Sequence, residues 1–481
     1  MAAEEYKVTI GMEVHAELRT QTKMFCTSKN DPDEAHANVN ICPVCLAHPG
    51  TLPVINREAV KHVLRVGLAL GSKLADYSEF DRKNYFYPDL PKGYQISQYE
   101  FPLVSGGELN GVAITRVHLE EDTASSIHDE ATGATLIDYN RAGVPLMELV
   151  TDPVISSAAQ AGAFARELQL LLRYLGASNA NMEKGEMRVE ANISVSKTST
   201  FGTKVEVKNL NSFRAMERAV AYEVERQIGV LEAGGQVLQE TRGWDEGKQA
   251  TFAQRIKEGS ADYRYFPDPD LPSLKISEVP DFAADKLQAS LPELPWVRRQ
   301  RYVTLGIKLE DADSYVRDGR LGSFLEEVIF AYPAGDPRIV LASNYIANDL
   351  VKIIRDSTTP DTESKHEIPI SARNFKTIMD MLGDKKISSR SAKDLIQMTI
   401  DEKKDPESIA KEKNLLKTDI SEEEIQTIVR EVISSNPTVV AEYRSGKLST
   451  LEYLVGQCMK NLRGAGDPEV LRTMIRSTLG S

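Results

Sequence analysis

The sequence predicts an α+β fold for the first part of the chain and an all-helical fold for the rest. Two observations predict this division. Short stretches with alternating polar and apolar residues are mixed with segments of helical spacing, without a regular strand–helix alternation. Beyond a proline-rich stretch at 266–298, the spacing of apolar residues is helical to the end. We expect a domain with a mainly antiparallel sheet at 1–293, a helical domain at 294–405 and a tail domain at 406–481.

Composition restricts the class of protein. The 481 residues are 41% hydrophobic and 27% charged, which is typical of a globular protein of about three domains. No apolar run approaches the roughly 20 residues that cross a bilayer, and no signal peptide is evident, so we expect a cytoplasmic protein without a membrane partner. The formal net charge of −13 argues against coating nucleic acid, DNA included, by bulk electrostatics. A local basic surface remains compatible with it.

The helices of the first domain have clear boundaries. Apolar residues at helical spacing are preceded by a capping residue, with Asn211 or Ser212 serving the third helix, and are followed by a glycine. Farther on, the charged stretch 401–414 predicts an exposed linker in front of the tail. The three predicted helices span 57–71, 156–176 and 211–235.

Five predicted strands combine an apolar face with a face of charged residues. In GMEVHAEL (11–18), Glu13, His15 and Glu17 point to one side, because side chains alternate along a strand. The other four strands lie within 113–126, 138–155, 182–196 and 203–210. Their charged faces carry Arg116, His118, Glu120 and Asp122; then Glu148; then Arg188 and Glu190; and finally Lys204, Glu206 and Lys208.

These strands predict a cation site if they share one sheet. Carboxylates in close company cannot all ionise without cations between them, and Mg²⁺ prefers carboxylate oxygens. Carboxylate-held Mg²⁺ beside Arg and Lys is what phosphoryl transfer needs. For any one strand alone, a solvated outer face is the more common explanation of the pattern. For all five strands together we expect the metal site, because a merely wet face would not favour Glu and His over Lys, Thr and Ser. No Walker A loop, kinase glycine loop or Rossmann fingerprint occurs, so a nucleotide site would be of another type.

Two aromatic-rich stretches and a cysteine group have open interpretations. The stretches 81–102 and 262–272 lack periodicity and are either binding loops over the sheet or packed connections. Cys26, Cys42 and Cys45 offer three thiols for a structural Zn²⁺, which His36 or His48 would complete. Ordinary buried thiols are the alternative.

The sequence resembles the B subunits of the tRNA-dependent amidotransferases over its whole length. The resemblance rests on GMEVHAEL, CPVCLAHPGTLPVIN, RKNYFYPDLPKGYQISQYE, HLEEDTASS, DYNRAGVPLMELV, MEKGEMRVEANIS, VEVKNLNSF and DYRYFPDPDLP. At the C-terminal end, NPTVVAEYRSGKLSTLEYLVGQCMK is similar to the tail module of that family.

The resemblance implies a fold, a reaction and partners. It implies a glutamine-synthetase-like cradle domain, a helical domain and a tail, the last two binding tRNA. ATP would phosphorylate the side-chain carboxylate of Glu-tRNA(Gln) or Asp-tRNA(Asn), and ammonia would displace the phosphate. The ammonia would come from an amidase A subunit, and a small C subunit would complete a heterotrimer.

The resemblance also implies site residues. The Mg²⁺ ligands match Glu13, His15, Glu120 and Glu148, which the alternation had already selected. Glu190 stands where we expect an aspartate in the family. Independently of the resemblance, we expect phosphate or carboxylate contacts from Lys83, Arg188 and Lys204. Family members with zinc have C-x-C before C-x2-C, whereas this chain has Cys26-Thr27-Ser28 and lacks one thiolate.

The tail has a surface charge that bears on function, and two alternative functions can be weighed against the sequence. The tail has a modest basic excess, which we expect to face the tRNA. A free-standing ATP-dependent amide ligase for a small acid would not need the helical tail. A scaffold that only binds tRNA would not need the carboxylates. The basic residues of the tail are Arg444, Lys447, Lys460, Arg463, Arg472 and Arg476.

Overall fold

The structure is a computed structural model that describes residues 6–129, 131–256, 262–356, 367–417, 422–462 and 466–480. The chain forms two compact units that divide between Pro295 and Trp296. This division lies close to the expected end of the first domain at residue 293.

One large sheet forms the frame of the first unit. Its strands are β1 (Lys7–Glu17), β2 (Lys73–Leu74), β6 (Val104–Ser105), β7 (Glu108–Leu109), β8 (Val112–Glu121), β11 (Pro145–Thr151), β12 (Met187–Ser196), β13 (Val205–Leu210), β14 (Glu240–Asp245) and β15 (Ala250–Ile256). Neighbours follow the order β15-β14-β13-β12-β1-β11-β8-β6-β2, with β7 beside β8. Within the described residues, the paired strands run antiparallel except for the parallel pair β13 and β14. The predicted α+β class with a mainly antiparallel sheet is confirmed.

Small sheets accompany the large one, and one of them corrects an expectation. The aromatic stretch 81–102 is not a loop throughout, because it contains β4 (Asp81–Asn84) and β5 (Tyr94–Ser97). Strands of four residues are too short to show a period of two. Their third partner, β16 (Phe266–Pro267), comes from the distant stretch 262–272. The other two small sheets pair β9 (Ser125–Asp129) with β10 (Ala134–Asp138) and β3 (Tyr77–Ser78) with β17 (Leu274–Lys275).

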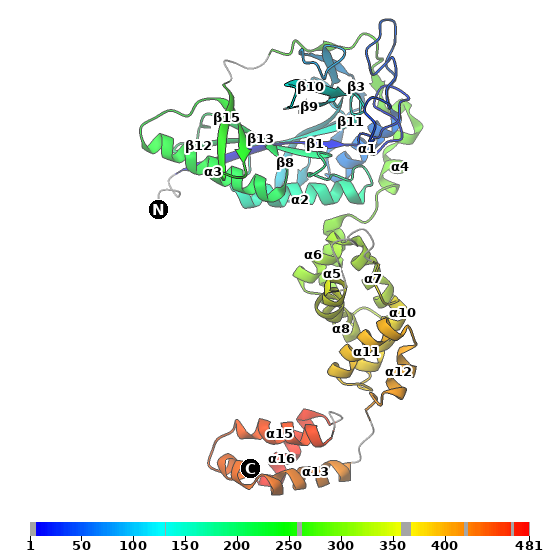
Figure 1. Cartoon of the computed structure of the whole chain (residues 1–481), viewed down its shortest axis with the longest axis vertical. Coiled ribbons are helices and arrows are strands. Elements are labelled where there is room, and N and C mark those ends of the chain that lie inside the picture. Colours follow the sequence, from blue (N-terminus) through cyan, green and yellow to red (C-terminus); the bar gives the residue numbers. More distant parts are fainter. Residues whose placement is uncertain are drawn as a thin grey trace. The chain divides into compact units, whose positions relative to one another are not determined.

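Three helices pack against the large sheet. Figure 1 shows α2 (Ala158–Tyr174) and α3 (Phe213–Glu232) along one side of it, and α1 (Arg57–Ala69) contacts β2, β6 and β8. All three predicted helices are confirmed. Asn56, Ser157 and Ser212 cap them by accepting hydrogen bonds from backbone N–H groups. The short helices η2 (Ile276–Glu278), η3 (Pro280–Phe282) and α4 (Ala284–Ala289) end this unit.

A close approach between α1 and the sheet gives a stability prediction. A Cβ atom on Gly67 would lie 2.6 Å from Val104 Cγ2 and 2.8 Å from Leu74 Cδ2. We expect Gly67→Ala to lower the free energy of unfolding by about 1–3 kcal/mol, because the packed core must shift. Denaturant unfolding of the purified chain measures this.

The matched control is Gly229→Ala in α3. A Cβ atom there would meet nothing within 4 Å. The alanine should stabilise the helix by up to about 1 kcal/mol through its higher helix propensity. Equal effects of the two substitutions would contradict the close packing of α1.

The second unit is helical. None of the helices in the described part of the chain is long and apolar enough to cross a membrane. The unit begins with α5 (Pro295–Thr304), α6 (Leu309–Arg317), α7 (Gly319–Ile329), α8 (Pro337–Tyr345), the π-helical turn η4 (Ile346–Leu350), α9 (Val351–Asp356), α10 (Ala372–Gly383), α11 (Ser389–Glu402) and α12 (Pro406–Glu412). The tail helices are α13 (Glu422–Ser435), α14 (Pro437–Arg444), α15 (Thr450–Asn461) and α16 (Pro468–Leu479).

The expected linker at 401–414 is wrong. Most of this stretch forms the end of α11 and helix α12, which packs against α10 and α11. Ile409 and Ala410 are fully buried, because the few apolar residues of this charged segment lie on one helical face. We therefore propose that the helical domain extends to Lys417 instead of ending at 405.

The tail has a hydrophobic core of its own. Helices α13, α14, α15 and α16 all contribute to it. Its buried residues are Val429, Val432, Val440, Tyr443, Leu451, Leu454, Val455, Cys458, Leu462, Leu471, Ile475 and Leu479.

Candidate active site on the sheet

The strand register gathers the predicted residues on one face of the large sheet, which we call the polar face. His15 of β1 lies opposite Glu148 of β11 on one side and opposite Arg188 of β12 on the other. Glu148 in turn lies opposite His118 of β8. Directly paired residues point to the same side of a sheet. The strands that looked alike in sequence are therefore neighbours.

A first cluster centres on the buried carboxylate of Glu148. Its Oε2 lies 3.3 Å from Nε2 of His15 and 3.4 Å from Nε2 of His118. Its Oε1 lies 3.7 Å from the Arg116 guanidinium. Glu120 lies 3.7 Å from Nε2 of His15 and accepts a hydrogen bond from Ser97 at 3.1 Å.

The β4 strand brings Lys83 to this cluster. Its Nζ lies 4.0 Å from Oε2 of Glu120. Burial by itself lowers the pKa of Lys83, but Glu120, Tyr265 and Glu148 together outweigh burial, and the pKa is raised. Lys83 therefore keeps its positive charge beside the carboxylates.

The electrostatics of the cluster show how strongly the groups are coupled. Burial by itself lowers the pKa of His15, but Glu148 and Glu120 raise it to about 9. Burial raises the pKa of Glu148, and the two histidines hold it well below the ordinary value. A buried carboxylate needs positive partners, and here it has several.

The first cluster fits a divalent cation. Single ligand atoms of His15, Glu120 and Glu148 all lie within 4.8 Å of one another. Ligands about 2.0–2.1 Å from Mg²⁺ must lie at most about 4.2 Å apart, so small side-chain adjustments suffice. Glu13, the fourth predicted ligand, belongs to a neighbouring group.

A second cluster lies beside the first one on the polar face. Glu13 is opposite Glu190 in the register, and carboxylate oxygens of Glu13, Glu190 and Glu206 also lie within 4.8 Å of one another. Lys208 Nζ lies 2.9 Å from Glu190 and 2.7 Å from Glu206. Burial and Glu148 raise the pKa of Glu13, as expected of carboxylates that repel each other.

Of the two lysines near β13, Lys208 and not the expected Lys204 lies beside the carboxylates. Lys204 is exposed and precedes the first residue of β13, so it is not brought into either cluster. Lys208 occupies the place between two carboxylates. The alternation within β13 had already put Lys208 and Glu206 on the charged face, and His118 was identifiable in the same way.

Arg188 lies at a third position on the polar face. Its guanidinium donates to Oδ2 of Asp122 at 2.8 Å, and Arg141 lies 3.7 Å from the same atom. Burial raises the pKa of Asp122, but the two arginines together lower it by more than burial raises it. The side chain of Asp122 is therefore an ionised carboxylate. Arg188 is about one-third exposed and can turn to an anionic ligand.

The three cysteines of the first unit also come together. Ligand sulfurs of Cys26, Cys42 and Cys45 lie within 4.8 Å of one another. Ser28 Oγ, which stands where a fourth thiol is expected, lies 3.9 Å from Cys45 Sγ. His48 lines the adjacent cavity with Cys26 and Cys45, and exposed His36 bonds to Glu34.

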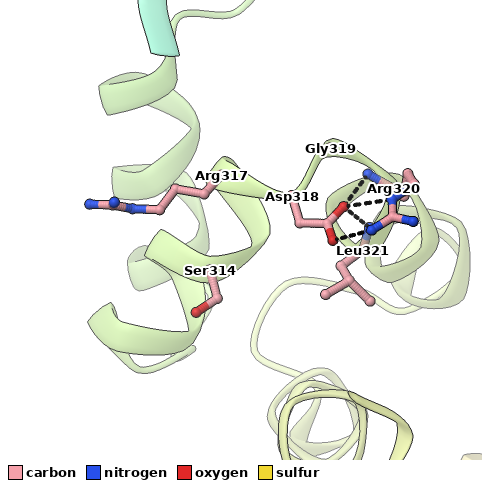
Figure 2. Close-up of a pocket in the computed structure, with 6 residues that line it drawn as sticks. All are labelled: Ser314, Arg317, Asp318, Gly319, Arg320 and Leu321. Carbon is pink, nitrogen blue, oxygen red and sulfur yellow. Dashed lines mark hydrogen bonds and ion pairs between the residues drawn. The ribbon is translucent and has the colours of Figure 1, made fainter. Parts of the chain in front are cut away.

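A surface hollow in the helical domain is not a candidate site. Figure 2 shows Asp318 at the junction of α6 and α7, with its carboxylate turned toward Arg320. The same carboxylate accepts the backbone N–H groups of Arg320 and Leu321 and caps α7. The Asp318 carboxylate of this hollow is therefore occupied in capping a helix and is not available to a ligand.

The fold and the polar face define a class of protein, namely a sheet domain that gathers carboxylates, histidines and basic side chains on one face and is followed in sequence by helical domains. Comparison with known families agrees with this class. The family described as GatB/GatE catalytic domain matches residues 8–280, and the family described as GatB domain matches residues 324–479.

Full-length relatives agree with the two family matches. The chain is 42% identical over 480 residues to the B subunit of the aspartyl/glutamyl-tRNA(Asn/Gln) amidotransferase of Thermus thermophilus, with 99% of each chain covered. It is 40% identical over 490 residues to the corresponding subunit from Carboxydothermus hydrogenoformans, again with 99% of each covered. The chain belongs to this family of amidotransferase B subunits, and the predicted family is confirmed.

Proposed function

We propose that this chain catalyses the ATP-dependent amidation of a side-chain carboxylate on misacylated tRNA. The γ-phosphoryl group of ATP passes to the carboxylate of Glu-tRNA(Gln) or Asp-tRNA(Asn), which gives an acyl phosphate and ADP. Ammonia then attacks the acyl carbon, phosphate leaves, and the amide forms with loss of a proton. The polar face carries this proposal, because activating a carboxylate requires cations around two anionic reactants.

The proposed roles follow from position. His15, Glu120 and Glu148 would hold Mg²⁺, with Glu13 close to them, and the metal would supply charge neutralisation at the phosphates. Lys83 and Arg188 can bind and orient phosphate or carboxylate oxygens, since Arg188 lies on the polar face, Lys83 reaches the first cluster from β4, and both keep their charges. Lys208 replaces Lys204 in this role, while Glu190 keeps Lys208 in place by an ion pair of 2.9 Å.

The proposed partners follow from the reaction. An amidase A subunit would hydrolyse glutamine to supply ammonia, and a small C subunit would complete a heterotrimer. The tail would bind tRNA, and we expect no membrane or DNA partner. We expect the activity in the cytoplasm, where charged tRNA is used in translation.

The experiment measures ATP hydrolysis by the chain in complex with its amidase partner, with and without each misacylated tRNA. Stimulation by one of the two tRNAs supports the proposal and identifies the substrate. ATP turnover that ignores tRNA favours a small-acid ligase. Tight tRNA binding without any ATP turnover favours a scaffold.

A structural zinc at the cysteine group leads to a second prediction. We propose that three thiolates hold Zn²⁺ weakly, because structural zinc sites almost always have four protein ligands. Ser28→Cys should raise the zinc content of protein washed with a mild chelator to about one ion per chain. Metal analysis of the parent and the variant measures this.

Thr27→Cys is the matched control, because it adds a thiol at the neighbouring position. We expect no gain of zinc from it. Equal zinc in the parent and in Ser28→Cys would refute the three-ligand explanation.

A further inference from the structure

A continuous series of tyrosines passes beside Lys83 and has an exposed ring at each end. We call Tyr87, Tyr85, Tyr263, Tyr265 and Tyr99, in this spatial order, the tyrosine series. Successive ring centroids lie 6.0, 5.9, 6.1 and 4.5 Å apart. The five tyrosines come from the two aromatic-rich stretches 81–102 and 262–272, and the proposed reaction gives none of them a role.

Lys83 links the tyrosine series to the first carboxylate cluster. Its Nζ lies 5.2 Å from the ring centroid of Tyr263 and 6.0 Å from that of Tyr85. The same atom lies 4.0 Å from Glu120. The middle of the series, at Tyr85 and Tyr263, is therefore close to the groups that would handle the reacting carboxylate.

The Tyr99 end of the series offers an open aromatic face. Tyr99 stacks on Tyr265 with an interplanar angle of 13°, so one of its ring faces is covered. Tyr99 is nevertheless 59% exposed. Its second face is therefore open to solvent, and a flat ring that packs parallel to another can extend the stack.

We propose that the open face of Tyr99 stacks on the terminal nucleobase of the aminoacyl-tRNA. This inference rests on the proposed function. The amino acid is esterified to the ribose of the terminal nucleotide, so its base must lie close by when the side-chain carboxylate reaches Lys83 and Glu120. A stacked base would hold the flexible 3′ end and orient the attached amino acid toward the polar face.

The adenine of ATP is the competing occupant, and the openness of the surface argues against it. Small-molecule sites are concave and bury most of the ligand surface. Tyr99 and Tyr87 are 59% and 57% exposed, and neighbouring Phe86 is 85% exposed. Exposed aromatic platforms are typical of binding to single-stranded nucleic acid, because every base has a flat face to stack.

The test measures binding of uncharged tRNA to the assembled complex without ATP. Full-length tRNA is compared with tRNA that lacks its terminal nucleotide, for the parent and for Tyr99→Ala. In the parent, removal of the nucleotide should weaken binding about 5- to 100-fold. In Tyr99→Ala, full-length tRNA should bind as weakly as the shortened tRNA, and shortening should then cost nothing more.

Two further variants control for indirect effects. Tyr99→Phe should keep the full difference between the two tRNAs, because stacking needs the ring and not the hydroxyl. Phe201→Ala, which removes another exposed ring of the same unit, should also keep it.

Three outcomes would overturn the proposal: a penalty for the shortened tRNA that persists in Tyr99→Ala, an increased KM for ATP in that variant with tRNA binding intact, or no tRNA binding at all. Failure of the proposed function looks different. The binding difference would then depend on Tyr99 while misacylated tRNA failed to stimulate ATP hydrolysis.

Discussion

Glu148→Gln is expected to lower ATP hydrolysis stimulated by misacylated tRNA by at least about 100-fold. Glu148 is the one carboxylate that lies within 4 Å of His15, His118 and Arg116 together, within the described part of the chain. The amide keeps the shape of the side chain but removes its charge, and with it one of the proposed ligands of the metal. The measurement is the rate of ATP hydrolysis at saturating tRNA, repeated over a range of Mg²⁺ concentrations.

Glu240→Gln is the matched control for this variant. Glu240 is also a buried carboxylate of the large sheet, 7% exposed, and it pairs with Arg242 at 2.6 Å. It also pairs with Arg226 of α3 at 3.7 Å, so it lies on the helix-covered face of the sheet and not on the polar face. The same chemical change should therefore cost stability without a comparable loss of rate. Full activity of Glu148→Gln, or an equal loss in both variants, would show that the polar face is not the site of phosphoryl transfer.

Much of the candidate site could be predicted from the alternation within single strands. A period of two puts Glu13 and His15 on the same face, and the same rule selects Glu120, Glu148 and Arg188 on other strands. Apolar residues between them, such as Val14 and Leu149, are fully buried, so a shift of register by one residue would exchange core and site. The strong contrast between the two faces explains why these predictions were possible.

Pairing between strands could not be predicted in the same way. The sequence of β1 alone does not predict that Glu148 and Arg188 are the neighbours of His15, because strand pairing depends on contacts across the whole sheet. Lys204 illustrates a related limit. Its position in the alternating pattern is correct, but β13 begins one residue later, and strand ends are set by pairing and not by local sequence.

Short or charged elements escaped prediction for different physical reasons. Strands β4 and β5 have four residues each, which is too few to show the alternation of polar and apolar residues that identifies a strand. Their sheet is completed by β16, which is distant in the sequence. Helix α12 is dominated by charges, yet Ile409 and Ala410 suffice to anchor it. In such segments a few contacts decide the structure, and composition misleads.

Removal of the tail from residue 422 onward is expected to raise the KM for tRNA at least about tenfold while glutamine hydrolysis by the complex is retained. The tail has its own buried core, so its removal need not unfold the rest. Arg444, Lys460 and Arg476 are exposed, whereas Lys447 and Arg472 are paired with Glu442 and Glu452 at 2.8 Å each. Arg463 lies outside the described residues. The first three residues are therefore the cations most able to meet phosphates.

A finer variant separates these charges from the shape of the tail. Replacing Arg444, Lys460 and Arg476 together by glutamine should weaken tRNA binding and reduce the slope of log K against log salt concentration by about 2 to 3, or close to 1 per phosphate contact. Lys447→Gln is the control, because Glu442 already neutralises that ammonium group, and its salt slope should match that of the parent. An unchanged slope in the triple variant would mean that the tail contacts tRNA through shape alone or not at all, and the KM of the truncated chain decides between these two.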